Sequence, residues 1–145
     1  MHFRNFKPFS KVSALTLGGG GIGQVWGETT KEEAIQTVHS ALDHGINHFD
    51  VAPMYGKGEA ERVLGESLNG KKKDNLFFTT KCQLGTLPED EVYDKLDSSL
   101  TKSLDNMKLN KVNLFLLHSQ LIEDNYKLFK FDELREKSAT TLSCF

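Results

Sequence analysis

The sequence contains little cysteine, proline or tryptophan, and it has no long hydrophobic run. Its two cysteines, Cys82 and Cys144, have no short spacing between them. This excludes a disulfide framework and a zinc ribbon, so we expect free thiols in a reducing compartment. Neither a secretory signal nor a membrane span can be placed anywhere, which predicts a cytoplasmic protein without a membrane partner.

An excess of charge of one sign is also missing. The chain has 18 Lys and Arg against 20 Asp and Glu, and its formal net charge is -2. No basic stripe appears, so electrostatics give no support for a nucleic-acid partner. With 38% hydrophobic and 26% charged residues, the composition is typical of a globular protein. We therefore interpret residues 1–145 as a single domain.

What the sequence does contain is an alternation of short apolar runs with amphipathic segments. The amphipathic segments predict helices from Thr30, from about Gly58 and from Thr86, and Thr30 with Glu33 fits a capping box. Each strand–helix pair has the length of one crossover unit, which predicts a parallel α/β fold. The apolar runs predict four strands, at residues 12–17, 46–51, 76–81 and 112–117.

After the fourth strand the pattern weakens, and no fifth strand can be found. Residues 119–145 are mixed in character, and we interpret them as a loop or tail in which the pattern allows a short helix near 131–136. Three aromatic residues of this segment could serve either a pocket or packing, namely Tyr126, Phe129 and Phe131.

Four polar residues stand at, or just past, the C-terminal ends of the predicted strands: Asp50, Tyr55, Lys81 and His118. In a parallel sheet these ends share one face, so we expect the four side chains to converge. Each alone has an ordinary structural explanation, such as a turn cap or a solvated charge. Together they favour a site where a phenol, beside a cation, donates a proton to a carbonyl oxygen.

The glycine-rich segment 18–23 contains the pattern G-x-G-x-x-G after a strand. A dinucleotide fingerprint needs a helix to open at this loop, whereas the next predicted helix begins near Thr30. The acid at the expected offset, Asp43, lies inside a helical pattern. We therefore interpret the segment as a strand-to-helix loop whose lack of side chains lets a flat ring approach the backbone.

In order and spacing, these motifs resemble the aldo-keto reductases. That family is a TIM (β/α)8 barrel that reduces carbonyls with a nicotinamide cofactor. The resemblance implies an α/β half barrel that holds about the first four β/α units. The matching segments are Gly23 to Trp26, Phe49 to Tyr55, Gly56 to Gly65, Thr79 to Lys81 and Leu114 to His118.

The resemblance implies a role for each matching position in the catalytic group. Tyr55 would be the general acid, and Lys81 would lie against it. Asp50 would pair with Lys81, and His118 would hydrogen-bond the substrate's carbonyl oxygen. Glu61, in the second predicted helix, would be structural rather than catalytic.

The resemblance further implies NADPH as cofactor and a small carbonyl or alcohol as substrate, with no metal. Gly21, Gly23 and Gln24 would contact the cofactor, and Trp26 would line the substrate pocket. Cys82 follows a catalytic position on its strand and should point to the other face, where it would serve packing only.

A complete barrel of this kind has eight strand–helix units, and the sequence predicts half that number. We therefore expect a fragment or a truncated form of a reductase, without most of the residues that grip the cofactor. One alternative is a half barrel that self-associates through exposed strand edges. Another is a non-catalytic interaction or regulatory protein that uses the same edges.

Overall fold

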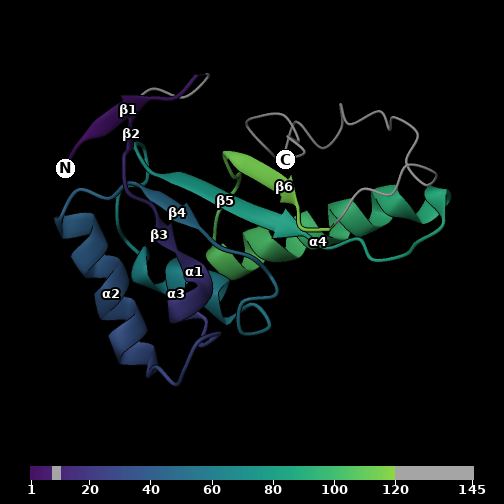
Figure 1. Cartoon of the computed structure of the whole chain (residues 1–145), viewed down its shortest axis with the longest axis horizontal. Helices are drawn as coiled ribbons and strands as arrows, with labels where there is room; N and C mark the ends of the chain where they lie inside the picture. The colour runs from purple at the N-terminus through teal and green to yellow at the C-terminus, as the bar shows by residue number, and fades with distance from the viewer. Residues whose placement is uncertain (8–10, 120–145) are drawn as a thin grey trace.

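The computed structural model describes residues 1–7 and 11–119, where an N-terminal hairpin precedes alternating strands and helices (Figure 1). The strands are β1 (Phe3–Asn5), β2 (Lys11–Ser13), β3 (Leu17–Gly18), β4 (His48–Asp50), β5 (Phe77–Cys82) and β6 (Leu114–Leu117). The helices are α1 (Gly19–Ile22), α2 (Lys31–Asp43), α3 (Glu59–Ser67), the 3-10 turn η1 (Glu89–Glu91) and α4 (Val92–Met107). The short helix expected near 131–136 lies outside the described residues, as do Cys144 and the three aromatic residues of the tail.

Strands β3 to β6 form a parallel sheet in which the spatial order follows the chain order. Helices α2, α3 and α4 lie side by side along one face of this sheet (Figure 1). The predicted parallel α/β fold is confirmed. Because every strand runs in the same direction, the C-terminal ends of β4, β5 and β6 meet at one rim.

Local sequence explains where the helices begin and end. The capping box predicted for α2 is present, because the Thr30 hydroxyl accepts from Glu33 N and Glu33 Oε2 accepts from Thr30 N. Gly45, just past α2, has a φ of +81°, the left-handed conformation that favours glycine.

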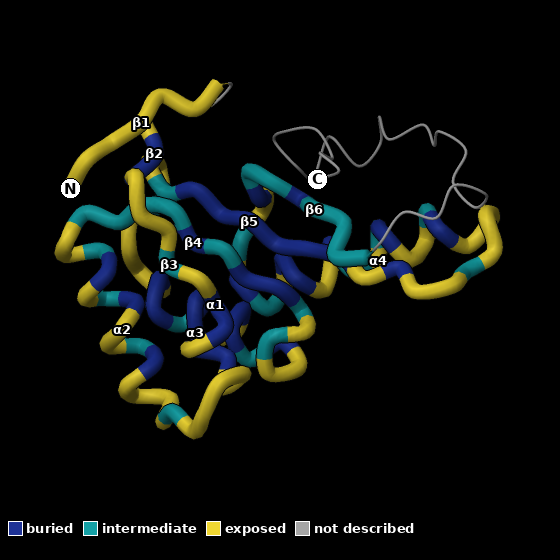
Figure 2. Tube along the Cα trace, in the orientation of Figure 1, coloured by how far each residue is buried: buried dark blue, intermediate teal, exposed yellow. Residues whose placement is uncertain are grey.

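The core fills the space between the sheet and the helices, as the buried strands and helix faces in Figure 2 show. The Phe49 and Phe78 rings stack at 6.0 Å between centroids. Each fully buried large apolar side chain stabilises the fold by roughly 1.5–3 kcal/mol. The fully buried residues of this core include Val38, Val63, Leu64, Leu68, Leu100 and Phe115.

The prediction of one strand over residues 12–17 is wrong. Residues of β2 pair antiparallel with β1, and only β3 joins the parallel sheet. The chain bends between them because Ser13 Oγ donates to Leu15 O at 2.6 Å, while Ser13 N donates to Asn47 Oδ1 at 2.7 Å. These bonds hold β2 near the N-terminal end of β4, away from the rim at the C-terminal ends of the strands.

One predicted loop and one predicted helix start are also wrong. A single helical turn, α1, opens directly after β3, where we expected a loop; Gly23 N donates to Gly19 O and closes the turn. The helix expected from Thr86 begins only at Val92, since Glu89–Glu91 form a 3-10 turn first. None of the helices in residues 1–7 and 11–119 has the length and apolar composition needed to cross a bilayer.

Candidate active site

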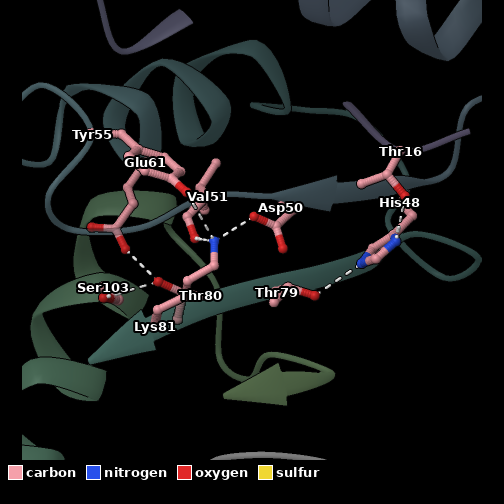
Figure 3. Close-up of polar contacts among 10 residues, drawn as sticks. All are labelled: Thr16, His48, Asp50, Val51, Tyr55, Glu61, Thr79, Thr80, Lys81 and Ser103. Carbon is pink, nitrogen blue, oxygen red and sulfur yellow. Dashed lines mark hydrogen bonds and ion pairs between the residues drawn. The ribbon is translucent and has the colours of Figure 1, made fainter. Parts of the chain in front are cut away.

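The four residues singled out at the strand ends meet at one rim of the sheet. Asp50 is the last residue of β4, Lys81 precedes the end of β5, and His118 follows β6. Tyr55 lies in the loop between β4 and α3, and its phenol points back toward Lys81 (Figure 3). The predicted convergence is confirmed as geometry.

The Lys81 ammonium is the centre of this group. Its Nζ donates to Asp50 Oδ1 in an ion pair, to Val51 O at 3.0 Å and to Tyr55 Oη at 3.4 Å. The same nitrogen lies 4.9 Å from the centroid of the Tyr55 ring. Lys81 is buried, and Asp50 supplies the carboxylate partner that a buried ammonium needs. The phenol is therefore held beside a paired lysine.

His118 stands across the rim from the phenol. Its ring is 6.0 Å from the Tyr55 ring and nearly perpendicular to it, at 88°. Burial lowers the pKa of His118, the nearby Lys81 charge lowers it further, and Asp50 opposes the shift. The imidazole is therefore neutral near pH 7, and its buried Nδ1 has no hydrogen-bond partner among the described residues.

A cavity of about 220 Å³ opens beside these groups. Lys81 and His118 form part of its wall, and the other lining residues are Pro53, Met54, Gln83, Lys95 and Ser99. A larger hollow of about 650 Å³ lies near the opposite ends of the strands, between Phe3 and Leu76, and none of the four rim residues lines it. Convergent polar side chains line the smaller cavity and mark it as a binding site, so the rim is the candidate active site.

Comparisons with known proteins decide the family. The model of the aldo/keto reductase family matches residues 14–139, most of the chain. The chain belongs to the aldo/keto reductase family. Its parallel sheet is the N-terminal part of that family's barrel, which confirms the predicted fold class.

Individual relatives agree with this assignment. L-galactose dehydrogenase of Arabidopsis thaliana is 31% identical over 110 residues, covering 74% of this chain and 34% of that protein. Aldo-keto reductase YhdN of Bacillus subtilis is 37% identical over 76 residues, covering 51% and 23%. The chain therefore spans only about a quarter to a third of these two curated relatives.

Solved structures share the fold. The thermostable aldo-keto reductase Tm1743, in complex with the inhibitor epalrestat, matches with a TM-score of 0.71 at 28% identity, covering 85% of this chain and 44% of that one. An aldo-keto reductase from Klebsiella pneumoniae in complex with NADPH matches with a TM-score of 0.65, covering 78% and 37%. At 23% identity, the second likeness shows the fold alone.

The glycine turn, residues 18–23, lies beside the rim; it faces open space on one side and contacts the Tyr55 loop on the other. A Cβ added to Gly21 would meet nothing within 4 Å, whereas one on Gly23 would lie 2.9 Å from the Tyr55 carbonyl. Gln24 has a positive φ of +59° and is exposed. Trp26 is 81% exposed and its ring covers Gly20. That these residues contact cofactor and substrate stays a prediction.

A second polar layer, which was not predicted from the sequence, lies beneath the rim. His48 Nδ1 and Thr16 Oγ1 lie 2.9 Å apart, as do His48 Nε2 and Thr79 Oγ1 (Figure 3). Since His48 and Asp50 are two apart on β4, they share a face of the sheet, and this spacing is the signal that could have revealed the layer. Burial lowers the pKa of His48; the Asp50 charge raises it and the Lys81 charge lowers it.

We expect His48 to make the protein less stable in mild acid. Its folded pKa lies below the ordinary value of 6.5, so the unfolded chain binds more protons between the two values. The free energy of unfolding therefore falls as pH drops below about 6.5 and levels off below the folded pKa. Urea unfolding at about pH 7.5 and 5.5 should show a smaller loss for His48→Gln than for the wild type. Equal losses would contradict the assignment.

Glu61 and Cys82 have the structural environments that the sequence predicted. Glu61 is fully buried on α3, where it accepts from Thr80 Oγ1 at 2.7 Å and from Asn106 Nδ2 at 2.9 Å. It thus links α3 to β5 and α4. Cys82 is buried on the helix-facing side of β5, and burial raises the pKa of its thiol, which favours the protonated, unreactive form. No cluster of metal-binding side chains occurs among the described residues.

Proposed function

We propose that the chain carries the proton-donating half of an NADPH-dependent carbonyl reductase, with Tyr55 as general acid. One observation supports this most strongly: Lys81 Nζ contacts both Asp50 Oδ1 and Tyr55 Oη. An ordinary surface lysine would have no reason to be buried between a carboxylate and a phenol. Because fold alone does not fix function, the proposal depends on these side chains.

The arrangement can protonate a carbonyl oxygen as its carbon is reduced. Tyr55 Oη would donate its proton to that oxygen, leaving a phenolate. The adjacent Lys81 ammonium would stabilise the phenolate, and Asp50 would hold the ammonium in place. An N–H of the neutral His118 ring would donate a hydrogen bond to the same oxygen and fix its angle.

A flat cofactor ring would have room beside the glycine turn. Gly18 and Gly21 leave open space beside the end of β3, where a side chain would otherwise stand. When bound there, NADPH would supply the hydride that adds to the carbonyl carbon. NADPH is present in the Klebsiella pneumoniae structure, and its use by this chain is part of the proposal.

The substrate class is proposed only as a small carbonyl compound, or an alcohol in the reverse direction. Relatives of this chain include an L-galactose dehydrogenase, a 6-dehydroglucose reductase and a pyridoxal 4-dehydrogenase, which differ in what their names say they act on. The exposed Trp26 ring offers an apolar surface that such a substrate could cover. Self-association through the edges of β3 and β6 stays a prediction, as does a cytoplasmic location.

Isotope transfer tests the proposed reaction. The purified protein is incubated with NADPH that carries deuterium at the transferable position and with a panel of small aldehydes. We expect the alcohol product to gain one deuterium for each NADPH consumed, as measured by mass spectrometry. A panel in which no product carries deuterium would contradict the proposal.

A further inference from the structure

We propose that Gly23 and Gly56 are positioning residues for Tyr55. The backbone of the glycine turn presses against the backbone of the Tyr55 loop, and this contact fixes where the phenol stands relative to Lys81. The inference rests on the proposed role of Tyr55, and it assigns to Gly23 a contact different from the cofactor contact that the sequence predicted.

The two chain segments approach more closely than any side chain allows. A Cβ on Gly23 would lie 2.9 Å from both the carbonyl carbon and the oxygen of Tyr55, and 3.0 Å from Tyr55 Cβ. A Cβ on Gly56 would lie 2.3 Å from Gly23 O. Cβ atoms essentially never come within 3.0 Å of a heavy atom that belongs neither to their own residue nor to its chain neighbours. Each segment therefore needs glycine at the point of contact, because the other segment fills the space.

Backbone conformation does not explain the glycine at position 23. Its φ of -99° and ψ of 10° are accessible to any residue. Gly56 differs, because its φ of +63° lies in the left-handed region and favours glycine for a second reason. Gly23 is therefore the position where the contact with Tyr55 is the sole observed requirement for glycine.

A third glycine supports the ring itself. A Cβ on Gly19 would lie 3.2 Å from Tyr55 Cδ2 and 2.8 Å from Val51 Cγ1. Gly21, in the same helical turn, faces open space. A side chain at Gly19 or Gly23 would therefore collide with Tyr55, whereas a side chain at Gly21 would not.

The phenol has little room to move without losing Lys81. The Oη to Nζ distance is 3.4 Å, close to the limit beyond which a hydrogen bond no longer forms. Relieving a 2.9 Å contact at Gly23 to ordinary van der Waals distance needs a shift of about 0.5 Å. A shift of that size, carried along the loop to the phenol, is enough to break the bond.

Fluorine NMR of the protein labelled with 3-fluorotyrosine tests the positioning without requiring any activity. The chain has three tyrosines, and the signals of Tyr55 and Tyr93 are assigned by their loss in Tyr55→Phe and Tyr93→Phe. We expect Gly23→Ala to shift the Tyr55 signal and to leave the Tyr93 signal, on α4, unchanged. Gly21→Ala is the matched control, and we expect it to move neither signal. A Tyr55 signal at the wild-type position in Gly23→Ala would overturn the inference.

Two further measurements complete the test. If Gly23→Ala fails to fold, Gly19→Ala replaces it, since the atoms it would meet include two side chains that can give way; the expected shift of Tyr55 alone is the same. In steady-state assays we expect Gly23→Ala to lower kcat roughly 10- to 100-fold relative to the wild type, with KM for the carbonyl substrate little changed. An inactive wild type would count against the proposed function, whereas the NMR shifts would still decide the positioning.

Discussion

Tyr55→Phe is expected to lower the rate of carbonyl reduction by about 10² to 10⁴, the usual contribution of a positioned proton donor. The substitution removes one oxygen and leaves the ring in place against Lys81, whose ammonium keeps its bonds to Asp50 and Val51 O. The loss should therefore fall on kcat, with little effect on KM or on stability. NADPH oxidation in the presence of an aldehyde measures it.

Tyr93→Phe is the matched control for this prediction. Tyr93 lies on α4, packs against the core and is not among the residues of the rim cavity. We expect its substitution to leave kcat within about twofold of the wild type, as is usual for a change remote from the chemistry. Equal rates for Tyr55→Phe and Tyr93→Phe would remove Tyr55 from the mechanism.

Glu61→Ala is expected to destabilise the fold by about 3 to 5 kcal/mol. The change removes the acceptor of the part-buried Asn106 amide and leaves the buried Thr80 hydroxyl only a longer bond of 3.5 Å to Ser103 Oγ. It also opens a cavity between α3, β5 and α4. Because small domains are stable by roughly 5–15 kcal/mol, this is a large share of the total. The midpoint and slope of urea unfolding measure it.

Two variants on α3 sharpen this stability prediction. Glu61→Gln keeps the carbonyl oxygen that can accept from Thr80 and should cost less than Glu61→Ala. Glu66→Ala removes a carboxylate from the exposed pair with Lys31 and should change the unfolding midpoint only slightly. A Glu61→Ala variant as stable as Glu66→Ala would show that the buried carboxylate does not hold the three elements together.

The residues that meet at the rim could be predicted from the sequence because the topology of a parallel sheet brings the C-terminal ends of its strands together. Once apolar strands are recognised, the residues at their C-terminal ends must share a rim, so Asp50, Lys81 and His118 follow from their places in the chain. The capping box at Thr30 was predictable for a similar reason, since both of its partners are local in sequence. Short-range patterns and the rule for parallel strands together account for these successes.

The features that the sequence did not reveal depend on contacts between distant segments. The separation of β2 from β3 is one example, because the hydrogen bonds between Ser13 and Asn47 that hold β2 join residues 34 apart. The role of Gly23 depends on the approach of the Tyr55 loop, which no pattern of glycines specifies. The sequence does not show that Gly23 contacts the Tyr55 loop while Gly21 faces open space, because both are glycines in the same glycine-rich segment.

A double-mutant cycle tests most directly whether the phenol and the ammonium act as one unit. Tyr55→Phe, Lys81→Met and the double variant are compared by kcat, with unfolding checked in parallel. The geometry predicts strong coupling: once the phenol is gone, Lys81→Met should slow the reaction little further, and the double variant should resemble the slower single one. A double variant slowed by the product of the two single effects would contradict the account.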